Sequence, residues 1–142
     1  MNTLTIIVPC FNEADVLVDF ISTVNLQTHE LPLIKKYLLI NDGSTDDTLD
    51  IMKNLSETFD NIFYLSFSRN FGKEAAMYAG FCNAKGDYVA VMDADMQDPP
   101  SLLPEMIKIL ETGEYDSVAT RRENRAGEPV TVAGLQESFI KS

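Results

Sequence analysis

The sequence predicts an α/β fold with a mostly parallel sheet and flanking helices, and three observations support this prediction. Short runs rich in Val, Ile and Leu alternate with helical segments of about 10–15 residues, which is typical of right-handed βαβ crossovers. With 142 residues, of which 45% are hydrophobic, the chain can form one domain and leaves little room for a second. No apolar run approaches the roughly 20 residues that span a bilayer, so no transmembrane segment is expected. The apolar run near the start of the chain ends at Pro9, so no signal peptide is expected either.

The first two strands are each expected to lead into a capped helix. Residues 4–8 form a β-branched run that predicts a buried strand, because strands of a parallel sheet are covered on both faces. Asn12 is expected to cap the helix that follows, since its side chain can accept a hydrogen bond from a free helical N–H. A second strand is expected at residues 38–40. Ser44 and Asp47 then resemble a capping box, which predicts that the second helix begins there.

Two further strand and helix units are expected in the rest of the chain. A third strand at residues 62–67 leads into a helix that is rich in small residues and begins near Lys73. The fourth strand is expected at residues 88–92, and the paired prolines after it predict a helix over residues 99–111. Residues 117–119 would form a fifth strand, after which the regular alternation stops.

The charge of the chain is strongly acidic and unevenly distributed. The formal net charge is -11; residues 1–120 carry 7 basic and 19 acidic side chains, whereas residues 121–142 carry 4 basic and 3 acidic ones. A polyanion needs a basic surface, so this distribution argues against a nucleic-acid partner. It suits a divalent cation, and a small anionic ligand would need the cations that come late in the chain.

Several classes of site are excluded by what the sequence lacks. His29 is the single histidine and lies in a polar segment, so a histidine-based triad or a zinc site is not expected. The glycine spacings of P-loop enzymes and of dinucleotide dehydrogenases are absent. Cys10 and Cys82 show no metal-ligand spacing and no disulfide framework, which favours a reduced, cytoplasmic setting.

Polar side chains follow each predicted strand. In an open parallel sheet the carboxyl ends of the strands meet at the edge where ligands bind. These residues are, in chain order, Asn12 and Glu13; Asp42 and Ser44; Arg69 and Lys73; Asp93, Asp95, Gln97 and Asp98; and Arg121 and Arg122. Each group alone has a simple structural explanation as a helix cap, a turn or the start of a helix. Together they predict a ligand site.

Of these patterns, Asp93-Ala94-Asp95 points most specifically to one kind of chemistry. Two carboxylates that flank one residue at a strand end can face one pocket, where they repel each other unless a cation lies between them. Hard oxygen ligands of this kind suit Mg²⁺ or Mn²⁺ bound together with substrate phosphates, and Gln97 could add a neutral oxygen. The alternative is an acidic loop before a helix, where the helix dipole favours aspartate.

Five segments of the sequence, in this order, resemble one known enzyme family. They are residues 7–13, 41–46, 68–74 and 93–100, and the segment Arg121-x-x-x-Arg125-x-Gly127-Glu128. Together they are similar to the family-two inverting glycosyltransferases of the Rossmann-like GT-A nucleotide-diphospho-sugar transferase fold, and within them to the polyprenyl-phosphate sugar transferases. The resemblance implies a nucleotide-sugar-binding catalytic domain at residues 1–128. Residues 129–142 would be the start of an acceptor-binding or membrane-proximal region.

The resemblance also implies roles for individual residues. The nucleotide sugar would be bound by Pro9, Phe11, Glu13, Asp42, Lys73, Asp93, Ala94, Asp95 and Arg121. A metal ion, Mg²⁺ or Mn²⁺, would be held by Asp93, Asp95 and Gln97. Asp93, Asp95 and Arg121 would be catalytic, and Arg122 and Arg125 would hold the acceptor phosphate, whose geometry arginine fits. Without the family context, a surface ion pair is the simpler explanation for each arginine.

The implied reaction transfers a hexose from a UDP- or GDP-sugar to a polyprenyl phosphate with inversion. Its place would be the cytoplasm or the cytoplasmic face of the membrane, whose surface full-length members contact. Family members continue well past the point where this sequence stops, so a chain truncated after the donor-binding half is expected. Residues 129–142 would then be either the first turns of an interfacial helix or a tail. Missing strands would leave a sheet edge that favours a homo-oligomer.

Two alternatives to this function remain open. One is a family-two transferase that acts on a saccharide acceptor, which the Arg125-x-Gly127-Glu128 pattern disfavours. The other is a non-catalytic fragment that binds a nucleotide sugar or merely packs, because turnover would need the missing part. The sugar, the base and the choice between Mg²⁺ and Mn²⁺ are equally open.

Overall fold

The computed structural model describes residues 2–97, 99–113, 117–119 and 139–141. Its elements are, in chain order, β1 (Asn2–Cys10), α1 (Leu17–Thr28), β2 (Leu33–Asn41), α2 (Thr48–Thr58), β3 (Ile62–Ser66), α3 (Lys73–Asn83), β4 (Tyr88–Val91), the short 3₁₀ helix η1 (Pro100–Leu102), α4 (Leu103–Glu111), β5 (Ser117–Ala119) and β6 (Phe139–Lys141). Among the described residues, no helix combines the length and the apolar character needed to cross a bilayer.

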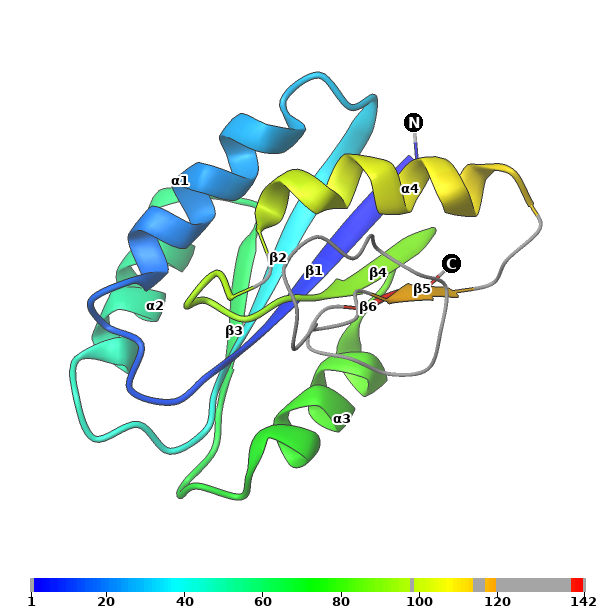
Figure 1. Ribbon diagram of the computed structural model, residues 1–142. Coiled ribbons are helices and arrows are strands. Elements are labelled where there is room, and N and C mark those ends of the chain that lie inside the picture. Colours follow the sequence, from blue (N-terminus) through cyan, green and yellow to red (C-terminus); the bar gives the residue numbers. More distant parts are fainter. Residues whose placement is uncertain (1, 98, 114–116, 120–138, 142) are drawn as a thin grey trace.

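The described strands form one sheet in the order β3-β2-β1-β4-β6-β5 (Figure 1). β1 lies between β2 and β4 and is parallel to both, and β2 is parallel to β3. β6 is antiparallel to its two neighbours, β4 and β5. The prediction of an α/β fold with a mostly parallel sheet and flanking helices is therefore confirmed.

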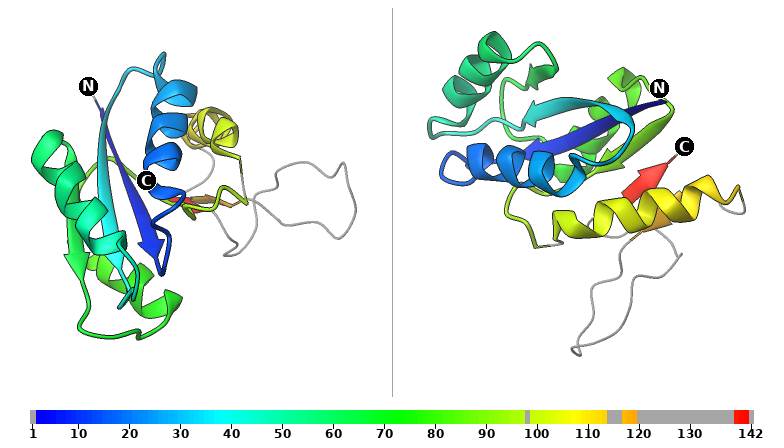
Figure 2. Two further views of the ribbon diagram at one scale, coloured as in Figure 1. Left: turned by 90° about the vertical axis from the view of Figure 1, so that its left-hand side faces the viewer. Right: turned by 90° about the horizontal axis from the view of Figure 1, so that it is seen from above.

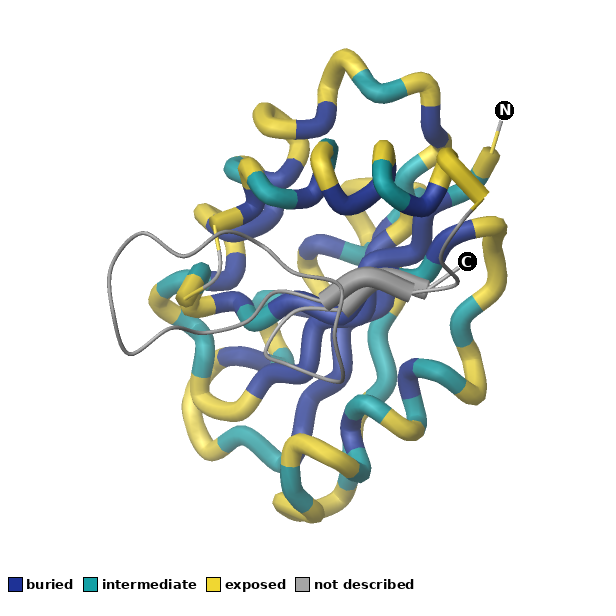
Figure 3. The backbone as a smooth tube through the Cα atoms, turned by 45° about the vertical axis from the view of Figure 1, so that its right-hand side comes forward, coloured by how far each residue is buried: buried dark blue, intermediate teal, exposed yellow. Residues whose placement is uncertain are grey.

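Helices cover both faces of this sheet (Figure 2). α1, α2 and α4 pack on one face, where Phe20, Met52 and Ile107 join Leu4 of β1 in the larger core. α3 packs on the other face, against a smaller core that contains Ile7 of β1. Figure 3 shows the buried backbone concentrated in the central strands. Because β1 is buried on both faces, it carries a continuous apolar run instead of an alternating one.

The small residues of α3 allow a close approach to β1. Ala76 and Gly80 are the buried positions of this helix. A Cβ atom at Gly80 would lie 2.4 Å from Cγ2 of Ile7, which is closer than two carbon atoms can pack. The glycine in the middle of the helix is therefore required by packing, although it lowers the intrinsic stability of a helix.

β1 is longer than the sequence predicts and continues through Pro9. The carbonyl of Ile7 accepts a hydrogen bond from Met92 on the β4 side, and the carbonyl of Cys10 accepts one from Asp42 on the β2 side. Since successive residues of a strand direct their backbone groups to opposite neighbours, Pro9 faces the side where β4 has already ended. Its missing N–H therefore leaves no hydrogen bond of the sheet unmade.

The two predicted helix caps are wrong. α1 begins at Leu17 and α2 at Thr48, and neither has a side-chain hydrogen bond at its cap; Asp47 is the cap residue of α2 but makes no such bond. Asn12 and Ser44 lie in the preceding loops, where the backbone N–H of Asn12 donates to Oγ of Ser44 at 3.0 Å. Asn12 therefore bonds to the loop before α2 instead of capping α1, and Ser44 bonds to the loop before α1 instead of capping α2.

The end of the chain also differs from the prediction. Phe139–Lys141 forms strand β6 and not the first turns of a helix or a tail. Phe139 is in register with Val91 of β4 and with Ala119 of β5, so this strand completes hydrogen bonding on both sides. A strand of three residues has too little periodicity to be found in a sequence. The other residues of the predicted loop and tail, 120–138 and 142, lie outside the described residues.

Candidate functional site

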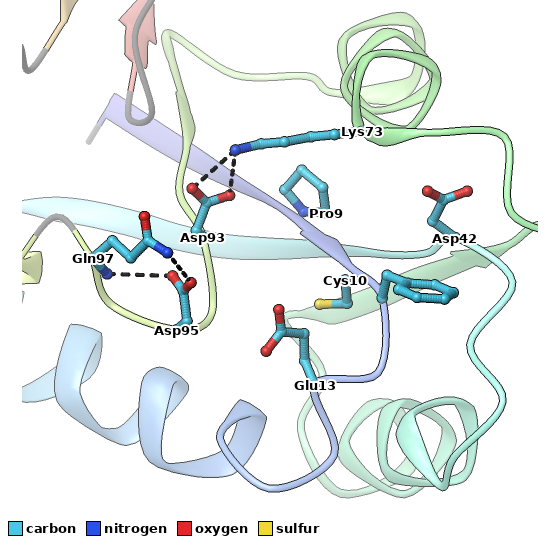
Figure 4. Close-up of a pocket in the computed structure, with 9 residues that line it drawn as sticks. Pro9, Cys10, Glu13, Asp42, Lys73, Asp93, Asp95 and Gln97 are labelled. Carbon is cyan, nitrogen blue, oxygen red and sulfur yellow. Dashed lines mark hydrogen bonds and ion pairs between the residues drawn. The ribbon is translucent and has the colours of Figure 1, made fainter. Parts of the chain in front are cut away.

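A cavity of about 390 Å³ opens at the carboxyl ends of β1, β2 and β4 (Figure 4). It is lined by Pro9, Cys10, Phe11, Glu13, Asp42, Lys73, Asp93, Asp95 and Gln97. All of these except Cys10 belong to the site that the sequence predicts. They come together because parallel strands present their carboxyl ends at the same edge of the sheet, where ligand sites of this fold class lie.

Asp42, at the end of β2, is buried and holds the loop before α3. The residue is 3% exposed. Oδ1 accepts the backbone N–H of Phe71 at 2.7 Å, and Oδ2 accepts that of Gly72 at 3.1 Å. Hydrogen bonds to a charged acceptor are stronger than neutral ones, so this carboxylate fixes the position from which α3, and with it Lys73, begins.

Asp93 and Lys73 form an ion pair inside the cavity. Nζ of Lys73 lies 2.9 Å from both Oδ1 and Oδ2 of Asp93. The side chain of Asp93 is 16% exposed and that of Lys73 is 45% exposed. Figure 4 shows the lysine extending from the start of α3 across the cavity to the aspartate that follows β4. The pair thus joins two sides of the site.

Asp95 is held by the turn that follows it. Its Oδ2 accepts a hydrogen bond from Nε2 of Gln97 at 2.7 Å, and its Oδ1 accepts the backbone N–H of Gln97 at 3.3 Å. The backbone N–H of Met96, which has a φ of 56°, donates to the carbonyl oxygen of Asp93 at 3.2 Å, and both aspartates of this turn line the cavity. Ala94 is fully buried in the larger core and does not line the cavity, so the structure does not place this predicted donor-binding residue in contact with a ligand there.

The carboxyl group of Glu13 has a pKa that reflects the negative charge of the cavity. Its backbone N–H donates to Oγ1 of Thr48 at 3.0 Å, which fixes the residue near the start of α2. Burial, and then the negative charges of Asp95, Asp93 and Asp46, raise the pKa of the Glu13 carboxyl above its ordinary value of 4.5. A raised carboxyl pKa means that a further negative charge is disfavoured here. The cavity is therefore a place where a cation is favoured.

The loops after β1 and β2 are joined by Asn12. Its Oδ1 accepts the backbone N–H of Thr45 at 2.8 Å and that of Asp46 at 3.3 Å. Asn12 has a φ of 54°, a left-handed conformation that asparagine tolerates better than most residues. Asp46 in turn accepts the backbone N–H of Ala14 at 3.3 Å. These bonds fix the loop that carries Phe11 and Glu13.

The loop after β3 packs closely on the turn at the end of β2. Gly43 has a φ of 68°, and a Cβ atom there would lie 2.2 Å from the backbone carbonyl carbon of Arg69, so only glycine fits. The guanidinium carbon of Arg69 lies 4.4 Å above the centroid of the Phe71 ring, at cation–π distance. Phe67 contacts the same ring edge to face, with centroids 5.7 Å apart.

Cys10 lines the cavity, and sequence reasoning missed it. Burial, and then the charges of Glu13, Asp93 and Asp46, raise the pKa of its thiol well above the ordinary range. Sγ lies 3.4 Å from the carbonyl oxygen of Val8, to which it donates. The thiol therefore stays protonated and is a poor nucleophile. Cys10 is the last residue of β1, and the cavity lies at the carboxyl ends of the strands. This position in the sequence is the signal that could have identified it.

The described acidic residues of the cavity fit a divalent metal ion that binds together with phosphates. Within the described ranges, no three His, Cys, Asp or Glu side chains form a ready metal cluster. Asp93 and Asp95 supply carboxylate oxygens, and Gln97 an amide, while Mg²⁺ usually takes its other ligands from water and phosphate. Asp93 already binds one cation, the Lys73 ammonium. The predicted residues Asp98, Arg121, Arg122 and Arg125 lie outside the described residues.

Comparison with known proteins places the chain in a family. The sequence matches the family described as Glycosyl transferase family 2 over residues 5–139. It is 41% identical over 138 residues to CsbB of Bacillus subtilis (strain 168), covering 97% of this chain and 41% of that protein. It is 37% identical over 123 residues to an undecaprenyl-phosphate 4-deoxy-4-formamido-L-arabinose transferase of Pseudomonas syringae pv. syringae, covering 86% and 36%. It is also 37% identical over 138 residues to the bactoprenol glucosyl transferase of Shigella phage SfV, covering 97% and 45%.

The chain spans less than half the length of these curated relatives. A solved structure of the mannosyltransferase PcManGT from Pyrobaculum calidifontis, in complex with GDP-Man and Mn²⁺, matches it with a TM-score of 0.70 and 23% identity. The match covers 86% of this chain and 36% of that one, and it confirms the GT-A fold. Because the family match covers residues 5–139, nearly the whole chain and every residue that lines the cavity, the chain belongs to glycosyl transferase family 2.

Proposed function

We propose that this chain is the donor-binding part of a glycosyltransferase that moves a hexose from a UDP- or GDP-sugar to a polyprenyl phosphate with inversion. The observation that carries the proposal is the cavity, which gathers Glu13, Asp42, Lys73, Asp93 and Asp95 at one edge of the sheet. The names of two relatives, which refer to undecaprenyl phosphate and bactoprenol, support a polyprenyl phosphate as the acceptor. The neighbour bound to GDP-Man supports the class of donor.

In this proposal the base and ribose lie against the ends of β1 and β2. Pro9 and the half-exposed ring of Phe11 offer apolar surface to a base. Glu13 and Asp42 would accept hydrogen bonds from base N–H groups or ribose hydroxyls, since carboxylates are strong acceptors. Each oxygen of Asp42 already accepts one backbone N–H, and each keeps a second lone pair for a ligand.

The diphosphate would lie near Asp93 and Asp95. These two residues, with Gln97, would hold Mg²⁺ or Mn²⁺, which supplies Lewis-acid stabilisation of the departing nucleoside diphosphate. Lys73, which lines the same cavity, is proposed to contact the diphosphate. Ala94, the buried residue between the two aspartates, is proposed to belong to the donor-binding set through the position of its backbone. Arg121 is proposed to contact the phosphates from the later part of the chain.

The reaction is proposed as a single displacement. An oxygen of the acceptor phosphate attacks the anomeric carbon, and the bond from that carbon to the diphosphate oxygen breaks as the new bond forms. The acceptor is already anionic near neutral pH, so positioning and electrostatics can lower the barrier without a strong base. Arg122 and Arg125 are proposed to position the acceptor phosphate, at the cytoplasmic face of the membrane.

A second candidate function follows from the length of the match. Because the chain spans 36–45% of its curated relatives, residues 1–128 could bind the nucleotide sugar without turnover, with the acceptor held elsewhere. A family-two transferase that acts on a saccharide acceptor would use the same donor cavity, so the cavity does not distinguish the two acceptors. Donor binding is therefore the property to test first.

Calorimetric titration tests donor binding directly. UDP-glucose and GDP-mannose are titrated into the purified chain with Mg²⁺ or Mn²⁺, and binding that requires the metal is expected for one of them. The Asp93→Asn, Asp95→Asn double variant should lose this binding. The Asp50→Asn, Asp60→Asn double variant changes the charge equally at exposed positions and should bind normally. A folded wild-type chain that binds neither donor would contradict the proposal.

A further inference from the structure

We infer that Lys73 occupies the cation position on Asp93 until a nucleoside diphosphate arrives, and that this exchange makes metal binding depend on the nucleotide. The inference rests on the proposed function, because it takes a diphosphate as the ligand of the cavity. It concerns how the binding of two ligands is coupled, which the proposed reaction does not specify.

The geometry of the ion pair is the first argument. The ammonium lies 2.9 Å from each oxygen of the Asp93 carboxylate, so it is centred on the position that a chelated metal ion would take. Oxygen ligands of Mg²⁺ lie at about 2.1 Å, which leaves no room for both cations on these two atoms. A metal ion on one oxygen alone would still be repelled by the nearby ammonium. Lys73 and a metal ion therefore compete for Asp93.

The charge of the cavity is the second argument. Its described lining has four carboxylates, on Glu13, Asp42, Asp93 and Asp95, against the single ammonium of Lys73. With Lys73 in place, burial first and then the charges of Asp95, Asp93 and Asp46 raise the pKa of Glu13, so negative charge from the two aspartates of the cavity still acts on it. A site with this excess of negative charge would bind free divalent cations unless part of it were already compensated. Lys73 supplies that compensation at Asp93.

The position of the lysine makes the exchange feasible. Lys73 is the first residue of α3, its stem is flexible, and its side chain is 45% exposed, so the ion pair is held weakly. A diphosphate brings negative charge that both Lys73 and a metal ion can bind. The lysine can then turn to the phosphates while the metal ion takes Asp93. Each ligand would strengthen the binding of the other, because such coupling is reciprocal.

Binding of the two ligands, separately and together, tests this inference. Lys73→Met removes the charge and keeps the stem, Lys73→Arg keeps the charge, and Lys53→Met makes the same change of charge at an exposed position of α2. Titrated with Mn²⁺ alone, Lys73→Met is expected to bind about fivefold more tightly than the wild type, the size of an exposed ion-pair effect. Lys73→Arg and Lys53→Met should match the wild type.

The nucleotide is tested in the second part of the experiment. With a chelator present, UDP or GDP should bind Lys73→Met more weakly than the wild type, because the lysine contact to the diphosphate is lost. The factor by which the nucleotide raises Mn²⁺ affinity should also be smaller in Lys73→Met. Calorimetry measures the Mn²⁺ affinity, the nucleotide affinity without metal and the factor by which one ligand raises the affinity for the other. Circular dichroism confirms that each variant is folded.

The outcomes separate the inference from the proposed function. Mn²⁺ affinity that is unchanged or lower in a folded Lys73→Met variant would overturn the inference, even if nucleotide binds normally. If neither UDP nor GDP binds with Mn²⁺, the proposed function and the coupling both fail. If Lys73→Met nevertheless binds Mn²⁺ more tightly than the wild type, the competition for Asp93 is supported although the proposed function has failed.

Discussion

The carboxylate of Asp42 accepts the backbone N–H of Phe71 at 2.7 Å, so a side chain at the end of β2 determines where the loop before α3 lies. The same carboxylate accepts the N–H of Gly72, the residue directly before Lys73. Asp42 is almost fully buried, so these bonds are largely shielded from competition by water. The position of the cavity lysine therefore depends on an aspartate that binds the two residues directly before it.

Asp42→Asn is expected to destabilise the chain by about 1–3 kcal/mol, the cost of an unpaired buried donor. Asparagine has one acceptor oxygen in place of two, and its NH₂ group would face a backbone N–H. Urea unfolding followed by circular dichroism measures the change. Asp60→Asn, at an exposed turn, is the control and should cost little. Equal stability of the two variants would contradict the structural role of Asp42.

Gly80→Ala is expected to destabilise the chain by about 1–3 kcal/mol, because the added methyl group overlaps Ile7 in a packed core. On helix propensity alone the same change would stabilise the chain by about 0.5–1 kcal/mol, so the sign of the effect is the test. Thermal unfolding of Gly80→Ala, of Ile7→Ala and of the double variant measures the coupling. The double variant should lose less stability than the two single losses combined.

Glu13→Gln is expected to stabilise the chain at neutral pH and to have no such effect in acid. Because burial and the charges of Asp95, Asp93 and Asp46 raise its pKa above 4.5, the folded chain binds the Glu13 proton more tightly than the unfolded chain does. Stability therefore falls as the pH rises from 4.5 through the raised value, and glutamine removes this loss.

Melting temperatures below pH 4.5 and at neutral pH test this sign. Glu57→Gln, on the exposed surface of α2, is the matched control. A difference between Glu13→Gln and the wild type that has the same size at both ends of the pH range would contradict a raised pKa at Glu13.

Asn12→Ala is expected to destabilise the chain more than Asn12→Gly, by about 1 kcal/mol, because only glycine tolerates the left-handed backbone without strain. Both variants lose the hydrogen bonds to Thr45 and Asp46. Amide hydrogen exchange at Thr45 should therefore be faster in both than in the wild type. Unchanged exchange at this amide would show that Asn12 does not hold the two loops together.

The sequence predicted the fold and the members of the cavity for the same physical reason. Strand runs such as 4–8 and 88–92 are apolar because they are buried on both faces, and this signal is local. Asp42 and Asp93 follow such runs closely and Glu13 lies in the loop after the first of them, so their meeting at one edge follows from parallel pairing. The roles proposed for Arg121, Arg122 and Arg125 stay predictions, since these residues lie outside the described ranges.

Interactions between distant parts of the chain could not be predicted in this way. The bond from Asn12 to Ser44 joins residues 32 positions apart, and the local rules for helix caps gave the wrong partner for both. The pairing of Lys73 with Asp93, 20 positions apart, requires the register of α3 on the sheet. β6 depends in the same way on partners that only the folded chain supplies.

The placement of β6 determines the order in which the sheet can be completed during synthesis. β2 joins β1, β3 joins β2, and β4 joins β1, so each of these strands finds a partner that has already been translated. β5 has only β6 as a described neighbour, with Ser117 opposite Lys141. On the ribosome, the described pairing of β5 with β6 therefore forms only after residues 139–141 have emerged. In a nascent chain halted before Phe139, β4 would lack its described neighbour β6, and an unpaired strand edge is the kind that recruits other chains.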